Sequence, residues 1–237
     1  DQYDITPIET AKLNRFIASL PKDKIEDNIK QAQLMFDRGE YFDALIALQT
    51  TLKIAEESKN KEKEGEILIK IGELQFLTGD SENAISTLIK AGEINRLLSN
   101  DMNLAVIYNL NGEIYASKGD FKNALDYYAT SKSLFEQEGV ETLVAQVLYN
   151  ESKILIEQKK YNLASPLLEK AIVKSKSEKA NDLTSKALVK SGLVYLNLNN
   201  LDKALSQTIE GFELANENNF SLQLQILFTL YVKRLDN

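Results

Sequence analysis

The sequence contains neither cysteine nor histidine. Disulfide bonds are therefore impossible, and cysteine usage carries no information about the redox compartment. Zinc sites built from thiolate or imidazole ligands are excluded, as are the Ser-His-Asp and Cys-His catalytic arrangements. We accordingly expect no metal ion, no cofactor and no enzymatic activity.

Long apolar runs and an excess of positive charge are missing too. No segment approaches the roughly 18–20 apolar residues of a membrane-spanning helix, so we expect no membrane insertion within this chain. The net charge of −7 argues against a nucleic-acid partner, which would require a basic face. The chain begins at Asp1 without a basic-then-apolar leader, and we interpret it as an excised or processed piece of a longer protein.

The sequence does contain an internal repeat with a period of 40 residues. Alanine recurs at this step, and a small residue precedes each alanine by twelve positions. The five pairs are Ala32 with Ala44, Gly72 with Ala84, Gly112 with Ala124, Ser152 with Ala164, and Gly192 with Ala204. Self-similarity at a period of roughly 20–50 residues indicates a repeat architecture, in which each unit packs only on its neighbours.

Each period consists of two apolar-periodic segments separated by a tight break. We expect glycine or asparagine in a left-handed turn at Gly39, Gly79, Gly119 and Asn199, with Lys159 as the departure. Looser polar links are expected between repeats, and Asp43, Ser81 and Asn162 are expected to cap the second helices. Because helix axes approach to about 8 Å only over small side chains, the paired small residues predict close helix crossings.

This pattern predicts about twelve helices and no strands. One flanking helix, starting at Thr6 and Pro7, is assigned to residues 1–24. The repeats occupy residues 25–237. Their expected limits are 25–61, 62–101, 102–139, 140–180 and 181–218, with a partial sixth repeat at 219–237.

The spacing resembles the tetratricopeptide repeat, whose signature is W-x2-L-G-x2-Y, then A-x3-F, then P. The best copy consists of Tyr108, Gly112, Tyr115, Ala124 and Tyr128. The period departs from the family's usual 34 residues, so the extra residues are expected in longer helices or links. The resemblance implies an all-α fold, a right-handed superhelical solenoid (α-α superhelix).

Long repeats of this kind resemble those of bacterial sensor kinases and regulators. The resemblance implies a protein- or peptide-binding module that forms the sensing or scaffolding region of a larger signalling protein. An extracytoplasmic location is implied by one group of these proteins and a cytoplasmic location by another. A structural or self-associating spacer without a groove ligand is the alternative, because one fold hosts many functions.

The family's ligand groove is lined by the first helix of each repeat. The groove positions carried over to this sequence are Ile29, Gln33, Phe36, Ile69, Glu73, Phe76, Asn109, Glu113, Tyr149, Lys153, Val189 and Leu193. Apolar residues beside amides and charges suit an extended peptide or a partner helix. The lysine and asparagine clamp with which some family members bind a peptide carboxylate is largely absent. Glu73 and Glu113 lack a nearby nucleophile, so we do not interpret them as a catalytic pair.

The last segment, residues 220–237, aligns with the first helix of a sixth repeat. Its apolar residues cover more than one helical face, and exposed apolar patches of some size mark interfaces. We therefore expect that the native chain continues, or that this helix meets a partner or another copy, in the last case forming a homodimer through Leu224 and Leu227.

Overall fold

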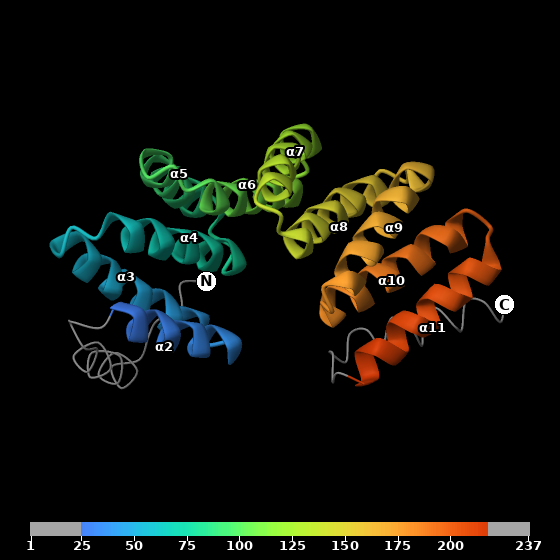
Figure 1. Ribbon diagram of the computed structural model, residues 1–237, viewed down its shortest axis with the longest axis horizontal. Helices are drawn as coiled ribbons and strands as arrows, with labels where there is room; N and C mark the ends of the chain where they lie inside the picture. The colour runs from blue at the N-terminus through green and yellow to red at the C-terminus, as the bar shows by residue number, and fades with distance from the viewer. Residues whose placement is uncertain (1–24, 218–237) are drawn as a thin grey trace. The chain divides into compact units, whose positions relative to one another are not determined.

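The computed structural model describes residues 25–217, which form ten α-helices and contain no strand (Figure 1). The helices are α2 (Ile25–Asp37), α3 (Tyr41–Glu57), α4 (Lys61–Leu77), α5 (Ser81–Leu97), α6 (Asp101–Ser117), α7 (Phe121–Gln137), α8 (Glu141–Glu157), α9 (Tyr161–Ser177), α10 (Asn181–Asn197) and α11 (Leu201–Glu217). The prediction of an all-α chain is confirmed. The expected helices in residues 1–24 and 219–237, with Leu224 and Leu227, lie outside the described residues. No helix in the described range is long and apolar enough to cross a membrane.

The turns between the helices are all of one kind. Helices α3 to α11 each have 17 residues. A residue with positive φ follows each helix from α2 to α10, two positions after its last residue: Gly39, Lys59, Gly79, Ser99, Gly119, Gly139, Lys159, Lys179 and Asn199. The prediction of looser links between repeats is wrong, because these turns match the breaks inside repeats. The residues beyond the usual family period therefore lie in the helices.

In five of the nine turns between the described helices, one residue serves both of the helices that it joins. The amide of Asp80 donates to the carbonyl of Gln75 at 2.7 Å, which closes α4 in a Schellman motif. The Asp80 carboxylate then accepts from the amide of Asn83 at 3.3 Å, which caps α5. Asn60, Asn100, Asp120 and Asn200 cap their helices in the same way. The predicted caps Asp43, Ser81 and Asn162 are wrong, because each lies inside the first turn of its helix.

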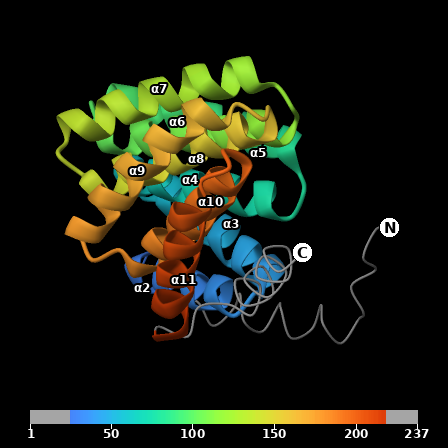
Figure 2. The same cartoon turned by 90° about the vertical axis from the view of Figure 1, so that its right-hand side faces the viewer.

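The described helices fall into two compact units, which divide between residues 114 and 115. In the first unit α2, α3, α4 and α5 pack on one another in succession (Figure 1), around a core that includes Leu48, Ile67 and Leu74. In the second unit α7 to α11 pack in succession, and Figure 2 shows α9, α10 and α11 side by side. Leu168 and Leu188 belong to a core cluster of this unit.

The repeated small residues lie where two helices of a pair approach closely. A Cβ atom at Gly72 would lie 2.8 Å from the side chain of Leu88 and 3.5 Å from the carbonyl oxygen of Ala84. At Gly192 the corresponding distance to the carbonyl oxygen of Ala204 is 3.0 Å. The predicted close crossing is thus confirmed in the second and fifth repeats, where a larger residue would push the helices apart.

Candidate functional site

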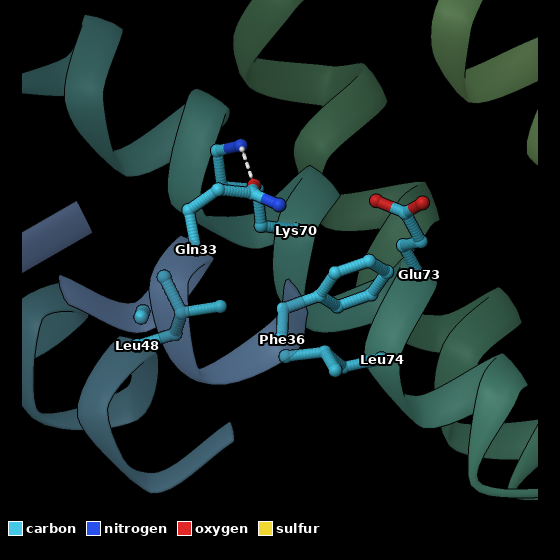
Figure 3. Close-up of a pocket in the computed structure, with 7 residues that line it drawn as sticks. Gln33, Phe36, Leu48, Lys70, Glu73 and Leu74 are labelled. Carbon is cyan, nitrogen blue, oxygen red and sulfur yellow. Dashed lines mark hydrogen bonds between the residues drawn. The ribbon is translucent and has the colours of Figure 1, made fainter. Parts of the chain in front are cut away.

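A pocket opens in the first unit between α2, α3 and α4 (Figure 3). It is a small hollow that is open to solvent. The lining residues are Ala32, Gln33 and Phe36 of α2, Leu48 of α3, and Lys70, Glu73 and Leu74 of α4. Gln33, Phe36 and Glu73 are among the groove positions predicted from the sequence.

The repeat itself brings these side chains together. Gln33 and Glu73 are one 40-residue period apart, so they occupy the same position on successive first helices. Phe36 lies one helical turn after Gln33, and Lys70 lies one turn before Glu73, so each pair shares a helix face. Two neighbouring first helices therefore supply both the polar and the aromatic side chains of the pocket.

The floor of the pocket is apolar and its rim is polar. Ala32, Leu48 and Leu74 are each 2% exposed and belong to the core of the first unit. Phe36 is half-buried, and its ring centroid lies 5.5 Å from that of Tyr41. In Figure 3 the polar ends of Gln33, Lys70 and Glu73 lie on the side away from Leu48 and Leu74. This arrangement suits a ligand group with an apolar body and a polar end.

Hydrogen bonds hold one end of the rim. The Lys70 Nζ donates to Gln33 Oε1 at 3.4 Å, and Gln33 Nε2 donates to Asp37 Oδ1 at 3.0 Å. The first bond joins α4 to α2, the second lies within α2, and together they fix the orientation of the Gln33 amide. Figure 3 shows the Lys70 amine beside Gln33, whereas Glu73 lies at the other end of the Phe36 ring.

Glu73 is the charged residue of the pocket whose side chain has no bonded partner among the described residues. Its carboxylate makes no hydrogen bond or ion pair within residues 25–217. Burial raises the pKa of Glu73 above its ordinary value, the nearby Lys70 charge opposes this rise, and Glu113 adds to it. Glu113 of α6 is thus a second carboxylate whose charge acts on Glu73.

The polar row continues onto α6. Asn109 Nδ2 donates to Glu113 Oε1 at 2.8 Å, and both residues are half-buried. We use the name first-helix face for the surface of unit 1 formed by Gln33, Phe36, Lys70, Glu73, Phe76, Asn109 and Glu113. Three successive first helices thus present amide, aromatic and carboxylate side chains.

Not all predicted groove positions present a side chain to a ligand. Ile29 is 5% exposed and Ile69 is 7% exposed, so both support the helix packing and are corrected to core positions. Phe76 is half-buried near the end of α4. Each isoleucine precedes a polar groove residue by one helical turn, so the sequence pattern placed it on the same helix face as that residue.

The remaining predicted positions lie in the second unit. Tyr149 is half-buried and packs at the edge of a core cluster, and Lys153 Nζ lies 5.6 Å from the centroid of its ring. Burial, followed by the Asp182 charge, raises the pKa of Tyr149 to about 12. Val189 and Leu193 are half-buried on α10. No group of three or more side chains suited to a metal ion occurs within the described residues.

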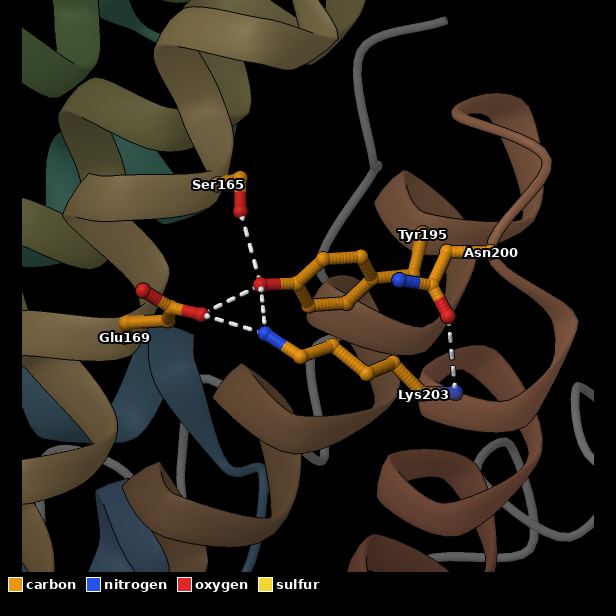
Figure 4. Close-up of polar contacts among 5 residues, drawn as sticks. All are labelled: Ser165, Glu169, Tyr195, Asn200 and Lys203. Carbon is orange, nitrogen blue, oxygen red and sulfur yellow. Dashed lines mark hydrogen bonds and ion pairs between the residues drawn. The ribbon is translucent and has the colours of Figure 1, made fainter.

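A polar cluster that the sequence did not reveal connects α9, α10 and α11 (Figure 4). Tyr195 donates its hydroxyl proton to Glu169 and accepts from Ser165 at 3.0 Å and from Lys203 Nζ at 3.2 Å. Lys203 Nζ also lies 4.7 Å from the centroid of the Tyr195 ring. The Tyr195 hydroxyl, and then Lys203, lower the pKa of Glu169. We interpret the cluster as a tie between successive helices, because Tyr195 is buried and the charged ends lie at its edge.

Comparisons with known proteins agree with this architecture. A tetratricopeptide repeat family model matches residues 103–172. No curated protein sequence matches the chain at a significant level.

Solved structures share the fold at low sequence identity. BtubC from P. vanneervenii is 18% identical, with a TM-score of 0.71 over 89% of this chain and 88% of that one. Aspartyl phosphate phosphatase F from Bacillus subtilis is 18% identical, with a TM-score of 0.77 over 88% of this chain and 56% of that one. NprR, solved with its cognate peptide NprX, is 20% identical, with a TM-score of 0.73 over 100% of this chain and 70% of that one.

At these identities the likeness shows the fold alone, and the chain spans little more than half of the phosphatase. The fold agrees with the matched repeat model and with the repeated small residues at the helix crossings. The described chain therefore has the tetratricopeptide-repeat fold with a 40-residue period, and residues 103–172 match the family's repeat model.

Proposed function

We propose that the protein is a protein- or peptide-binding module and that its ligand lies along the first-helix face. The observation that carries this proposal is the pocket at Phe36, which has an apolar floor and a rim formed by Gln33, Lys70 and Glu73. Its neighbours Asn109 and Glu113 extend the polar row onto the next first helix.

The openness of the pocket favours part of a larger ligand over a free metabolite. Small-molecule sites bury most of their ligand, whereas the Phe36 pocket is open to solvent. A peptide can place one apolar residue in such a pocket while its neighbours meet the amides and carboxylates along the helices.

The wider role that we propose is the sensing or scaffolding region of a larger bacterial signalling protein. Support comes from the fold shared with NprR, whose solved complex contains its cognate peptide, and with a phosphatase for aspartyl phosphate. The alternative, a structural or self-associating spacer, depends on Leu224 and Leu227, which lie outside the described residues.

Selection from a random dodecapeptide display library on the immobilised chain tests peptide binding. Enriched peptides are then synthesised, and their affinities are measured by fluorescence anisotropy for three proteins. These are the parent, a groove variant with Gln33→Ala and Phe76→Ala, and a control with Ile89→Ala and Lys90→Ala on the exposed side of α5. We expect the groove variant to bind about tenfold or more weakly, since a few anchor residues carry most binding energy.

The control variant is expected to bind like the parent, and thermal melts show whether each variant is folded. Peptide binding on this face is refuted if no peptide is enriched, or if folded groove variant and parent bind the enriched peptides equally. A homodimer found by light scattering together with an empty selection would favour the spacer instead.

A further inference from the structure

We propose that the ligand presents a cationic side chain, lysine or arginine, to Glu73 and Glu113, with an adjacent apolar residue in the Phe36 pocket. This inference rests on the proposed binding at the first-helix face and adds the chemical class of the ligand. It predicts the opposite charge preference from a groove that clamps a peptide carboxylate.

The first argument is the environment of Glu73. Its side chain is half-buried at the rim of the pocket, and its carboxylate has no hydrogen-bond donor or ion-pair partner within residues 25–217. A partly desolvated carboxylate without donors is unfavourable, because the lost hydration is not replaced. The ammonium or guanidinium group of a ligand would supply N–H donors and the opposite charge together.

The second argument is the position of Glu113. It comes from the neighbouring first helix, and its charge acts on Glu73 in the same direction as burial does. Asn109 holds one oxygen of Glu113, so this carboxylate is oriented by its own helix. Two carboxylates on adjacent helices repel each other, and a cation bound between them would reduce that repulsion.

The third argument is that the cation already present acts on Glu73 only through its charge and makes no ion pair with it. Lys70 is the one basic residue that lines the pocket, and it lies one helical turn before Glu73. Its amine donates instead to Gln33 on α2, and it makes no ion pair with Glu73. Figure 3 shows the Lys70 amine beside Gln33, whereas the Glu73 carboxylate lies apart from it, toward the outer end of the Phe36 ring. The negative end of the rim is therefore left to the ligand.

The fourth argument is the wall between the two ends. Phe36 offers an aromatic ring beside Glu73, and the aliphatic stem of lysine or arginine packs favourably against such a ring. A guanidinium group over the ring face would gain a cation–π contact as well. The apolar floor at Leu48 and Leu74 then accommodates the neighbouring apolar residue of the peptide.

The composition of the selected peptides tests this inference directly. We expect enrichment of peptides in which lysine or arginine is next to an aliphatic or aromatic residue. For the strongest binder, replacing the cationic residue by glutamine should weaken binding to the parent about tenfold or more, the scale of one charge-assisted contact. Glu73→Gln in the protein should cause a similar loss, whereas Glu93→Gln on the exposed side of α5 should cause none.

A variant with reversed charge at the two glutamate positions provides a second test of the cationic ligand. The double variant Glu73→Lys with Glu113→Lys should select acidic peptides from the same library and lose the cationic ones. Enriched peptides that lack a cation, or that bind Glu73→Gln as tightly as the parent, would overturn the cationic class and leave peptide binding itself intact. An empty selection would overturn both proposals, so the two failures are distinguishable.

Discussion

Gly192 of α10 faces Thr208 of α11 so closely that a Cβ atom at position 192 would lie 2.1 Å from the Thr208 hydroxyl oxygen. Thr208 has little freedom to move away, because it is 1% exposed and its hydroxyl donates to the Ala204 carbonyl at 2.8 Å. The small residue twelve positions before the repeated alanine is thus a steric requirement of the helix pair.

We expect Gly192→Ala to lower the free energy of unfolding by about 1–3 kcal/mol through overpacking. Urea denaturation followed by circular dichroism measures this change. The matched control is Gly92→Ala in α5, where an added Cβ would meet no atom within 4 Å. That variant should gain roughly 0.5–1 kcal/mol, since alanine is the better helix former. Equal effects at the two positions would show that steric contact does not decide the outcome.

The backbone of the turn before α9 is strained, because a lysine occupies its positive-φ position. Lys159 has φ of 58°, a left-handed conformation that costs a non-glycine residue about 1–2 kcal/mol. Lys159→Gly should therefore stabilise the protein by about 0.5–1 kcal/mol, after subtraction of the greater flexibility of glycine in the unfolded chain. Lys170→Gly, the same substitution at an exposed position inside α9, should destabilise by about 1 kcal/mol. Thermal melts in which both substitutions raise the melting temperature, or both lower it, would contradict the backbone strain assigned to Lys159.

Glu73 should make stability depend on pH. A carboxyl whose pKa is raised in the folded chain keeps its proton longer when folded, so its contribution to stability is full below the ordinary value of 4.5. This contribution is lost as the pH rises through the folded pKa. Relative to the parent, Glu73→Gln should therefore be more stable at pH 7 than at pH 4.5. Urea unfolding at both pH values measures this, with Glu93→Gln as the control, and a difference independent of pH would refute the expectation.

The Tyr195 cluster should stabilise the second unit through its hydroxyl more than through its charges. Tyr195→Phe keeps the ring but removes the group that links Ser165, Glu169 and Lys203, and should cost about 1–2 kcal/mol. Lys203→Met should cost less than Tyr195→Phe, because the side chains of Lys203 and Glu169 are 54% and 47% exposed and water screens their ion pair. Chemical denaturation of both variants compares the two, and a larger loss for Lys203→Met would assign the stabilisation to charge.

Local features of the sequence determined the helices and the repeat. Apolar periodicity and the recurrence of small residues depend on neighbouring positions, so the five helix pairs could be predicted without coordinates. Gly39, Gly79 and Gly119 marked their turns because glycine tolerates positive φ. The equally tight turns at Lys59 and Lys179 gave no such signal, since lysine does not favour that conformation, and they arise because the helices on both sides pack at fixed positions.

The 40-residue period also showed which faces of the first helices repeat, and hence the candidates for a binding face. Helix packing then placed Ile29 in the core and Gln33, one turn later, at the lining of a pocket. It also brought Glu169, Tyr195 and Lys203 into one cluster across separations of 26 and 34 residues. Burial and cross-helix contact depend on how each helix is rotated against its neighbours and on how far each side chain reaches. Packing sets those quantities, and periodicity along one helix does not contain them.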